Sequence, residues 1–266
     1  MSNKFLKKVK KKIEILIYLK KCYLISVQKK EIKMQIKGCC VLSVIPLRAE
    51  PSDKAEMTNQ VLYGETFDII IKEEKWSKIK LHHDQYEGWI DNKQWMITKK
   101  SKHNLRKGNI VQTPLLKYQS KLFPAGSNVD FDIVEHKKSL LQTAKQFLNT
   151  PYLWGGRTMM GIDCSGFTQI VFRLHKIFIP RDAYQQANIG KKVAWKDVMN
   201  NDLAFFANTE GKIIHVGIII KDKTKTSIIH ASGMVRIDTL NEQGIRNEEL
   251  DIYTHTLHSI KRIKND

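Results

Sequence analysis

A short glycine-rich stretch, GGRTMMGIDCSGF at residues 155–167, places one cysteine where a loop passes into a helix. Beyond Cys164, apolar side chains recur at helical spacing, which predicts a helix over Ser165–His175 with one buried face. A thiol in the first turn lies at the positive end of the helix dipole, which favours the thiolate. Cys164 is therefore a candidate nucleophile; the alternative is a structural cysteine, because free cysteines are commonly buried.

The length and the cysteine count limit the possible architectures. A chain of 266 residues favours two domains, and an apolar content of 42% is enough for a sizeable folded core. The four cysteines, at positions 22, 39, 40 and 164, show no paired spacing. This pattern indicates neither a disulfide framework nor a CxxC metal site, and it favours a reducing compartment.

The positive charge is concentrated at the start of the chain. The formal net charge is +18, and residues 1–33 contribute eleven lysines and two glutamates, or +9 of that total. The charges in the rest of the chain are mixed in sign and are typical of a solvated surface. We therefore expect no nucleic-acid partner.

Residues 1–33 form a basic extension in which lysine clusters flank a short apolar run, Ile13 to Leu19. That run is too short to span a bilayer, and no small-x-small cleavage site follows it. The segment is a basic amphipathic helix at a membrane surface, a poor signal or anchor, or an extension upstream of a natural start at Met34. We expect any membrane contact to be confined to it.

Short alternating segments separated by polar turns predict a small all-β barrel over residues 34–98. The order Leu-Tyr-Gly-Glu, strand, Trp-x-Lys-Ile, turn, Gly-Trp-Ile resembles the bacterial SH3-like domain. That resemblance implies binding of cell-wall peptides or positioning of a catalytic neighbour. Residues 99–138 are expected to form either a β-rich connector, with strands at 109–111 and 131–134, or a degenerate second SH3-like unit.

From Ser139 onward, helical periodicity precedes a series of strands. Leu140 to Leu148 fit one buried helical face, and Thr150-Pro151 ends that helix. Strands are then expected at 203–206, 215–220, 227–232, 235–237 and 260–263. Helices followed by consecutive hairpin strands predict an α+β domain with an antiparallel sheet over residues 139–266.

Two histidines at strand ends supply partners for the thiol. His215 opens one predicted strand and His230 closes the next, so an antiparallel hairpin brings both to the same edge of the sheet. Cys164 would then be the nucleophile, His215 the base that later protonates the leaving amine, and His230 the group that orients His215. A Cys-His-His zinc site is the rival interpretation. The long gaps and the thiol at a helix start favour catalysis, and we expect no metal or organic cofactor.

Five motifs occur in the order found in the NlpC-type cell-wall cysteine peptidases, which this part of the chain resembles. They are YLWGG at 152–156, DCSGF at 163–167, DLAFF at 202–206, HVGI at 215–218 and IHAS at 229–232. The resemblance implies a papain-like core and catalytic roles for Cys164, His215 and His230. Asn201-Asp202 stands where the family often has Gly-Asp, which is a minor departure.

Together with the SH3-like domain, the sequence resembles the γ-D-glutamyl-L-diamino-acid endopeptidases of the dipeptidyl-peptidase VI type. That resemblance implies hydrolysis of L-Ala-γ-D-Glu-diamino-acid peptides with a free N-terminus, and so recycling of murein peptides. An ammonium group in a closed pocket requires a carboxylate partner. Asp182 is the first candidate for that partner and Glu65 the second, while the guanidinium of Arg181 is suited to the D-glutamyl carboxylate.

The remaining candidates complete the predicted site. The Tyr152 hydroxyl and the backbone N–H of Cys164 are candidate oxyanion donors. Asp163 is expected to be structural or to position substrate, and Ser165 is expected to contact substrate. Trp89, Trp95 and Trp154 are expected either to line the pocket or to pack in a core. His82, His83, His255 and His258 are expected at the surface.

The sequence therefore predicts a monomeric murein-peptide hydrolase. A catalytically idle wall-binding protein on the same scaffold and an endopeptidase acting on intact peptidoglycan are the alternatives. The third substrate residue, diaminopimelate or lysine, stays open. We expect a cytoplasmic location, with a periplasmic or envelope-associated one as the alternative.

Overall fold

The computed structural model describes four stretches of the chain: residues 36–98, 109–133, 137–248 and 250–263. The basic extension predicted at residues 1–33, which includes Cys22, lies outside these stretches. Within them, no helix combines the length and the apolar character that crossing a bilayer requires.

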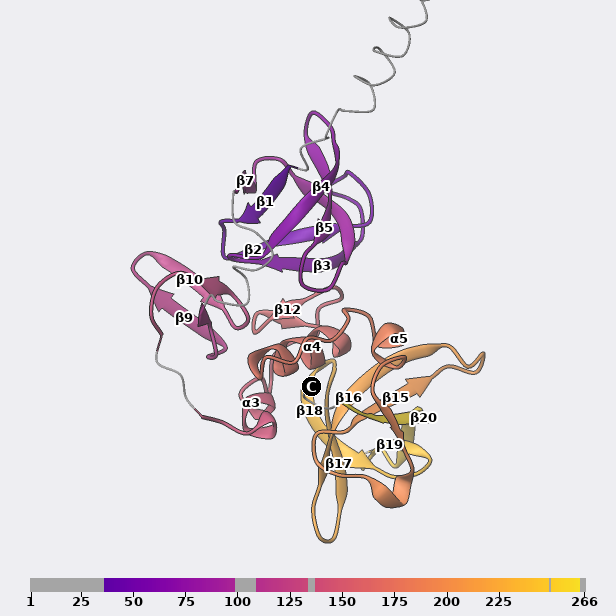
Figure 1. The fold of residues 1–266 in the computed structure, drawn as a ribbon. Helices are drawn as coiled ribbons and strands as arrows, with labels where there is room; N and C mark the ends of the chain where they lie inside the picture. The colour runs from indigo at the N-terminus through magenta and orange to yellow at the C-terminus, as the bar shows by residue number, and fades with distance from the viewer. Residues whose placement is uncertain (1–35, 99–108, 134–136, 249, 264–266) are drawn as a thin grey trace, which may run out of the picture. The chain divides into compact units, whose positions relative to one another are not determined.

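The first described domain is a seven-stranded antiparallel sheet that curls around its own core (Figure 1). Its strand order is β3-β2-β6-β5-β4-β1-β7. The strands are β1 (Lys37–Cys40), β2 (Val44–Arg48), β3 (Met57–Leu62), β4 (Thr66–Lys72), β5 (Trp76–Leu81), β6 (Glu87–Asp91) and β7 (Trp95–Ile97). Every second side chain of β5 is buried, and Phe67 and Trp95 pack edge to face in the core. The predicted SH3-like barrel is confirmed.

Two small two-stranded sheets follow the barrel. They pair β8 (Asn109–Ile110) with β11 (Asn128–Val129), and β9 (Leu115–Tyr118) with β10 (Lys121–Pro124). Phe123 lies in their shared core and packs edge to face on Tyr63 of the barrel. Residues 131–133 of the strand predicted at 131–134 are not in a strand, and Val134 lies outside the described residues.

The last domain begins with short helices and ends in a second sheet. The helical segments are α3 (Leu140–Lys145), α4 (Cys164–Leu174), α5 (Ala183–Gln186) and the 3₁₀ turn η1 (Trp195–Asp197), and a small hairpin, β12 (Arg157–Thr158) and β13 (Gly161–Ile162), precedes α4. The remaining strands are β14 (Lys191–Val193), β15 (Leu203–Ala207), β16 (Ile213–Lys221), β17 (Thr226–Ser232), β18 (Met234–Leu240), β19 (Gly244–Asn247) and β20 (Ile252–Arg262).

The second sheet is antiparallel and closes on itself. Its order is β14-β20-β15-β16-β17-β18-β19, and β19 also pairs with β20. The helix α4 packs on β16 and β17, where its apolar side chains, including Phe167 and Ile170, share a core with Val216 (Figure 1). Phe206 of β15 and Ile228 of β17 belong to a separate core within the same domain. The predicted α+β class with an antiparallel sheet is confirmed.

Two boundaries differ from the sequence prediction for local reasons. The helix α4 begins at Cys164 because the Asp163 side chain caps it by accepting a hydrogen bond from the Gly166 N–H. The helix α3 ends at Lys145, before Leu148, and Leu148 is therefore exposed although its spacing predicted burial.

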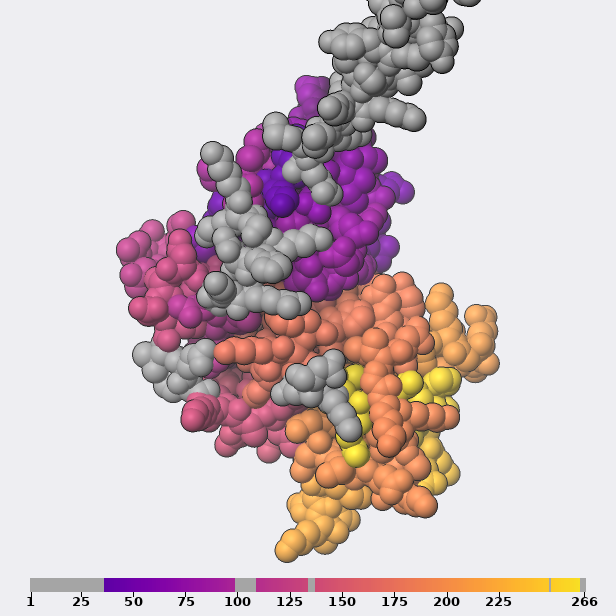
Figure 2. Space-filling view, in the orientation of Figure 1, coloured from indigo at the N-terminus to yellow at the C-terminus, as the bar shows by residue number. Residues whose placement is uncertain are grey.

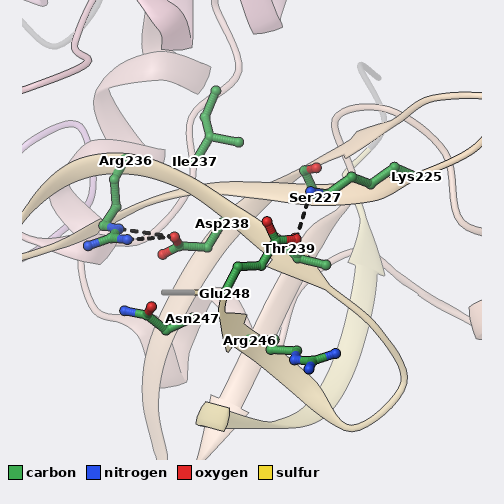
Figure 3. Close-up of a pocket in the computed structure, with 9 residues that line it drawn as sticks. All are labelled: Lys225, Ser227, Arg236, Ile237, Asp238, Thr239, Arg246, Asn247 and Glu248. Atoms are coloured by element: carbon green, nitrogen blue, oxygen red, sulfur yellow. Dashed lines mark hydrogen bonds and ion pairs between the residues drawn. The ribbon is translucent and has the colours of Figure 1, made fainter. Parts of the chain in front are cut away.

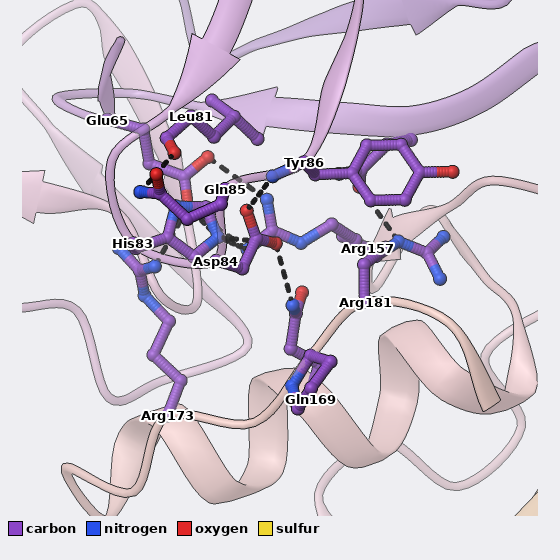
Figure 4. Close-up of polar contacts among 12 residues, drawn as sticks. Glu65, Leu81, His83, Asp84, Gln85, Tyr86, Arg157, Gln169, Arg173 and Arg181 are labelled. Carbon is purple, nitrogen blue, oxygen red and sulfur yellow. Dashed lines mark hydrogen bonds and ion pairs between the residues drawn. The ribbon is translucent and has the colours of Figure 1, made fainter. Parts of the chain in front are cut away.

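A buried ion cluster joins the barrel to the last domain (Figure 4). Glu65 of the barrel is 1% exposed and pairs with Arg157 at 3.0 Å and with Arg173 at 2.9 Å. Burial alone would raise the pKa of Glu65, but Arg157, His83 and Arg173 outweigh burial and hold it at about 2. Gln169 of α4 also donates to Asp84 of the barrel at 2.9 Å. The space-filling view shows the barrel in indigo and purple (Figure 2).

Candidate active site

Cys164 lies where α4 meets β16. It is the first residue of α4 and is 6% exposed. Its thiol is within hydrogen-bonding reach of the backbone at Ser165 and at Val216, the residue that follows His215. The nucleophile candidate is therefore held between the first turn of the helix and the strand that carries the candidate base.

The Asp163 carboxylate organises the loop around the cysteine. It accepts hydrogen bonds from the Gly155 N–H at 2.9 Å and from two nitrogens of Arg181 at 2.9 and 2.5 Å. Arg181 Nε also donates to Asn59 of the barrel at 2.8 Å. Gly155 has φ +74°, and a Cβ there would lie 2.3 Å from the Met57 carbonyl oxygen, so only glycine fits. Asp163 thus has a structural role in the resting protein.

The hairpin β16–β17 brings the two predicted histidines together. His215 Nε2 lies 2.7 Å from His230 Nδ1, and both side chains are buried. His230 Nε2 lies 2.9 Å from an Asp238 carboxylate oxygen on β18. The ring of His255, from β20, stacks on His215 with centroids 4.2 Å apart. The side chains of His215, His230 and Asp238 therefore form a connected row.

The resting protonation states differ from the sequence expectation of a thiolate. Burial raises the pKa of the Cys164 thiol to about 12, Asp163 adds to the rise, and hydrogen bonds from the backbone at Val216 and Ser165 oppose it. Burial also lowers the pKa of His215 well below 6.5. Because burial outweighs the favourable helix position, it favours the uncharged forms of the Cys164 thiol and of the His215 imidazole.

Tyr152 lies near the thiol and Asp182 lies near Asp163 and Arg181, and their predicted roles stay predictions. Asp182 is half-buried at the start of α5 and accepts a hydrogen bond from the hydroxyl of Tyr86, a barrel residue. Burial raises the pKa of Asp182, and Arg181 opposes that rise. Burial likewise raises the pKa of Tyr152, with contributions from Cys164 and Asp163 that reflect their proximity.

The structure corrects the roles predicted for Glu65 and Arg181. The carboxylate of Glu65 is enclosed by Arg157 and Arg173 and therefore cannot also receive a substrate ammonium. The guanidinium of Arg181 is 1% exposed and donates to Asp163, Ser165 and Asn59, so its donors are engaged within the protein. Ser165, which binds Arg181, belongs to the same structural cluster.

The three tryptophans occupy different environments. Trp89 is half-buried on β6 and lies opposite Arg48 and Lys78 in the barrel sheet, whereas Trp95 packs in the barrel core. Trp154 is 60% exposed, and its indole N–H donates to Glu56 at 2.5 Å. Of the three, Trp154 is the one that borders the glycine-rich loop.

Three of the histidines expected at the surface have specific partners. His82 is buried between Thr66 and Asp68 of the barrel. His83 contacts Asp84 within the ion cluster, and His255 stacks on the candidate base. His258 is exposed, as expected.

Asp238 and His255 are the neighbours of the histidine pair that the sequence reasoning missed. Asp238 could have been found from the strand register. A turn at Gly233 sets Arg236 opposite His230, and Asp238, two residues further on, is therefore the diagonal neighbour of His230 on the same face of the sheet. His255 could not have been found in this way, because it arrives through the closure of the sheet by β20. Among the described residues, no group of three His, Cys, Asp or Glu side chains is arranged to hold a metal ion.

Two family models match separate parts of the chain. Residues 149–253 match the NlpC/P60 family, and residues 47–94 match the bacterial dipeptidyl-peptidase Sh3 domain. The first match contains Cys164, His215 and His230 together, and the second covers most of the barrel strands.

Several known proteins are similar to the chain. A gamma-D-glutamyl-L-lysine dipeptidyl-peptidase from Bacillus cereus is 39% identical over 111 residues, which cover 41% of this chain and 33% of that protein. Dipeptidyl-peptidase 6 from Lysinibacillus sphaericus is 26% identical over an alignment of 256 residues. The aligned regions cover 74% of this chain and 89% of that protein. The chain thus spans about a third of the length of curated relatives such as the first.

A crystal structure of an NlpC/P60 family protein from Bacillus cereus has the same fold. It matches with a TM-score of 0.67 at 20% identity, over 85% of this chain and 99% of that one. Residues 149–253 of the chain are therefore an NlpC/P60 domain, and residues 47–94 are a bacterial dipeptidyl-peptidase SH3 domain.

Proposed function

We propose that the protein is a cysteine peptidase that hydrolyses the γ-D-glutamyl–diamino-acid bond of murein peptides with a free N-terminal L-Ala. The observation that carries this proposal is the placement of Cys164 at the start of α4, with its thiol against the strand of His215 and with His215 held by His230 at 2.7 Å. The names of the relatives, both dipeptidyl-peptidases, support the substrate class.

The reaction would begin with transfer of the Cys164 proton to His215. The thiolate attacks the carbonyl carbon of the γ-D-glutamyl bond, and the oxyanion is stabilised by the backbone N–H of Cys164 and the Tyr152 hydroxyl. His215 then gives its proton to the leaving amine of the diamino acid. Water activated by His215 hydrolyses the thioester, which releases L-Ala-D-Glu and restores the thiol.

Recognition of the free amine would depend on Asp182. Its carboxylate is half-buried beside Tyr86 of the barrel, where an ammonium group would neutralise a partly desolvated negative charge. Glu56, which lies beside Trp154 at the glycine-rich loop, is the second acidic group that we assign to this region in place of Glu65.

The thiol mechanism is tested with Cys164→Ala and the tripeptide L-Ala-γ-D-Glu-L-Lys. We expect kcat for release of L-Ala-D-Glu to fall by roughly 10⁴- to 10⁶-fold, because the nucleophile is gone. Mass spectrometry of the products measures the rate, and circular dichroism checks that the variant is folded. Cys39→Ala, which removes a half-buried thiol of the barrel, is the matched control and should keep full activity. Turnover by Cys164→Ala close to that of the wild type would contradict the mechanism.

A further inference from the structure

Asp238 lies behind the histidine pair and contacts neither His215 nor the thiol among its described partners. One carboxylate oxygen, Oδ2, lies 2.9 Å from His230 Nε2. The other, Oδ1, accepts hydrogen bonds from Arg236 Nε at 3.1 Å and from Arg236 Nη2 at 2.8 Å. Asp238 therefore links an arginine to His230, and through His230 to His215.

The protonation state of Asp238 follows from these contacts. Burial would raise the pKa of Asp238, but the hydrogen bonds from His230 and Arg236 outweigh burial and lower it below 3.8. Asp238 also lines a polar hollow of about 200 Å³ with Lys225, Arg246 and Glu248. Figure 3 shows the Arg236 guanidinium directed at the Asp238 carboxylate in this hollow. Asp238 is thus a carboxylate, which can only accept hydrogen bonds.

An ionised Asp238 determines which nitrogen of each histidine carries its proton. Because the carboxylate accepts, His230 must carry a proton on Nε2, and the Nδ1 of its neutral ring is then a bare acceptor. At 2.7 Å from that acceptor, His215 Nε2 must donate, so His215 also carries its proton on Nε2. The lone pair of His215 is left on Nδ1, the nitrogen that does not contact His230 and is able to accept a proton.

We propose that Asp238 is a positioning residue that acts through His230 to hold His215 in the tautomer with a basic Nδ1. This inference rests on the proposed thiol mechanism, in which His215 takes the proton of Cys164. The order of the row is Arg236, Asp238, His230, His215, and in the proposed mechanism only its last member acts on the reacting groups. The stacked ring of His255 restrains the plane of His215 but does not select its tautomer.

The activity test is Asp238→Asn. The two Arg236 donors favour the amide oxygen on their side, which turns the amide NH₂ toward His230 Nε2 and reverses both tautomers. An amide in place of the triad carboxylate of a serine protease lowers kcat about 10⁴-fold through the wrong tautomer. Asp238 is one residue further from the nucleophile, so we expect kcat to fall about 10- to 100-fold. KM should stay within about two-fold, because Asp238 would make no substrate contact.

The matched control is Asp251→Asn, which removes an exposed carboxylate that pairs with Arg246 outside the row. It should keep wild-type kcat and KM. A kcat of Asp238→Asn within about two-fold of that control would overturn the proposal. A change in KM alone would overturn it too, because that result would indicate a substrate contact.

A second readout does not depend on turnover. Nitrogen-15 NMR of the histidine rings distinguishes the two tautomers in the wild-type protein at neutral pH. We expect protons on Nε2 of both His215 and His230 in the wild type, and on Nδ1 of both in Asp238→Asn. A wild-type His230 with its proton on Nδ1 would overturn the inference even if the peptidase activity is found. Active Cys164→Ala with the expected tautomers would instead contradict the proposed function and leave the hydrogen-bond assignment standing.

Discussion

At the scale of single residues, Cys164 is subject to opposing influences. The start of α4 favours a negative charge, but the Asp163 carboxylate that caps this helix lies beside the thiol and disfavours one. Arg181 offsets part of that repulsion. Burial is the largest influence, and it favours the uncharged forms of both Cys164 and His215.

This balance predicts how the free enzyme reacts with a thiol reagent. A raised pKa means that the thiolate fraction grows with pH until the pKa is reached, so inactivation by iodoacetamide should accelerate about tenfold per pH unit between about pH 7 and pH 9. Activity remaining after timed exposure measures the rate, and labelling of Cys164→Ala gives the background from the other cysteines. A rate that is already constant across this range would indicate a preformed thiolate–imidazolium pair.

At the scale of elements, local patterns predicted the parts of the site that local sequence determines. A short turn joins the end of β16 to the start of β17, so the start of β16 with His215 and the end of β17 with His230 meet at one edge. The end of α3 and the strand β14 were not predictable in this way. The strand β14 is short and polar, and it pairs with β20, a strand distant in sequence.

The difference between local and long-range determinants also explains which site residues were missed or misassigned. Asp238 is a close neighbour of His230 across one hairpin, and register alone would have found it. His255 needs the closure of the sheet by β20. Glu65 belongs to a Leu-Tyr-Gly-Glu segment that is typical of an exposed turn, and only tertiary packing brings Arg157 and Arg173 around it.

At the scale of the whole molecule, the ion cluster makes the barrel part of the structure that holds the active site. Glu65 of the barrel compensates two buried arginines of the last domain, one in β12 and one in α4. A buried charge left without its partner is strongly destabilising. The barrel should therefore unfold together with the NlpC/P60 domain.

Glu65→Gln tests this coupling. Loss of the charge leaves Arg157 and Arg173 without the carboxylate that pairs directly with both, which we expect to lower the free energy of unfolding by about 3–5 kcal/mol. The melting temperature should then fall by about 6–20 °C in near-UV circular dichroism. The control is Glu50→Gln, which removes an exposed carboxylate of the same domain and should leave the melting temperature unchanged. Equal melting temperatures for the two variants would show that the cluster does not couple the domains.

The activity that we propose is cleavage of small murein peptides with a free amino terminus. The most direct test compares the wild-type protein on L-Ala-γ-D-Glu-L-Lys and on the same peptide with its amine acetylated, with products read by mass spectrometry. We expect release of L-Ala-D-Glu from the free peptide and cleavage at least about 100-fold slower for the acetylated one, since the proposed ammonium partner of Asp182 is lost. Equal rates on the two peptides would contradict it and would indicate an endopeptidase acting on intact peptidoglycan.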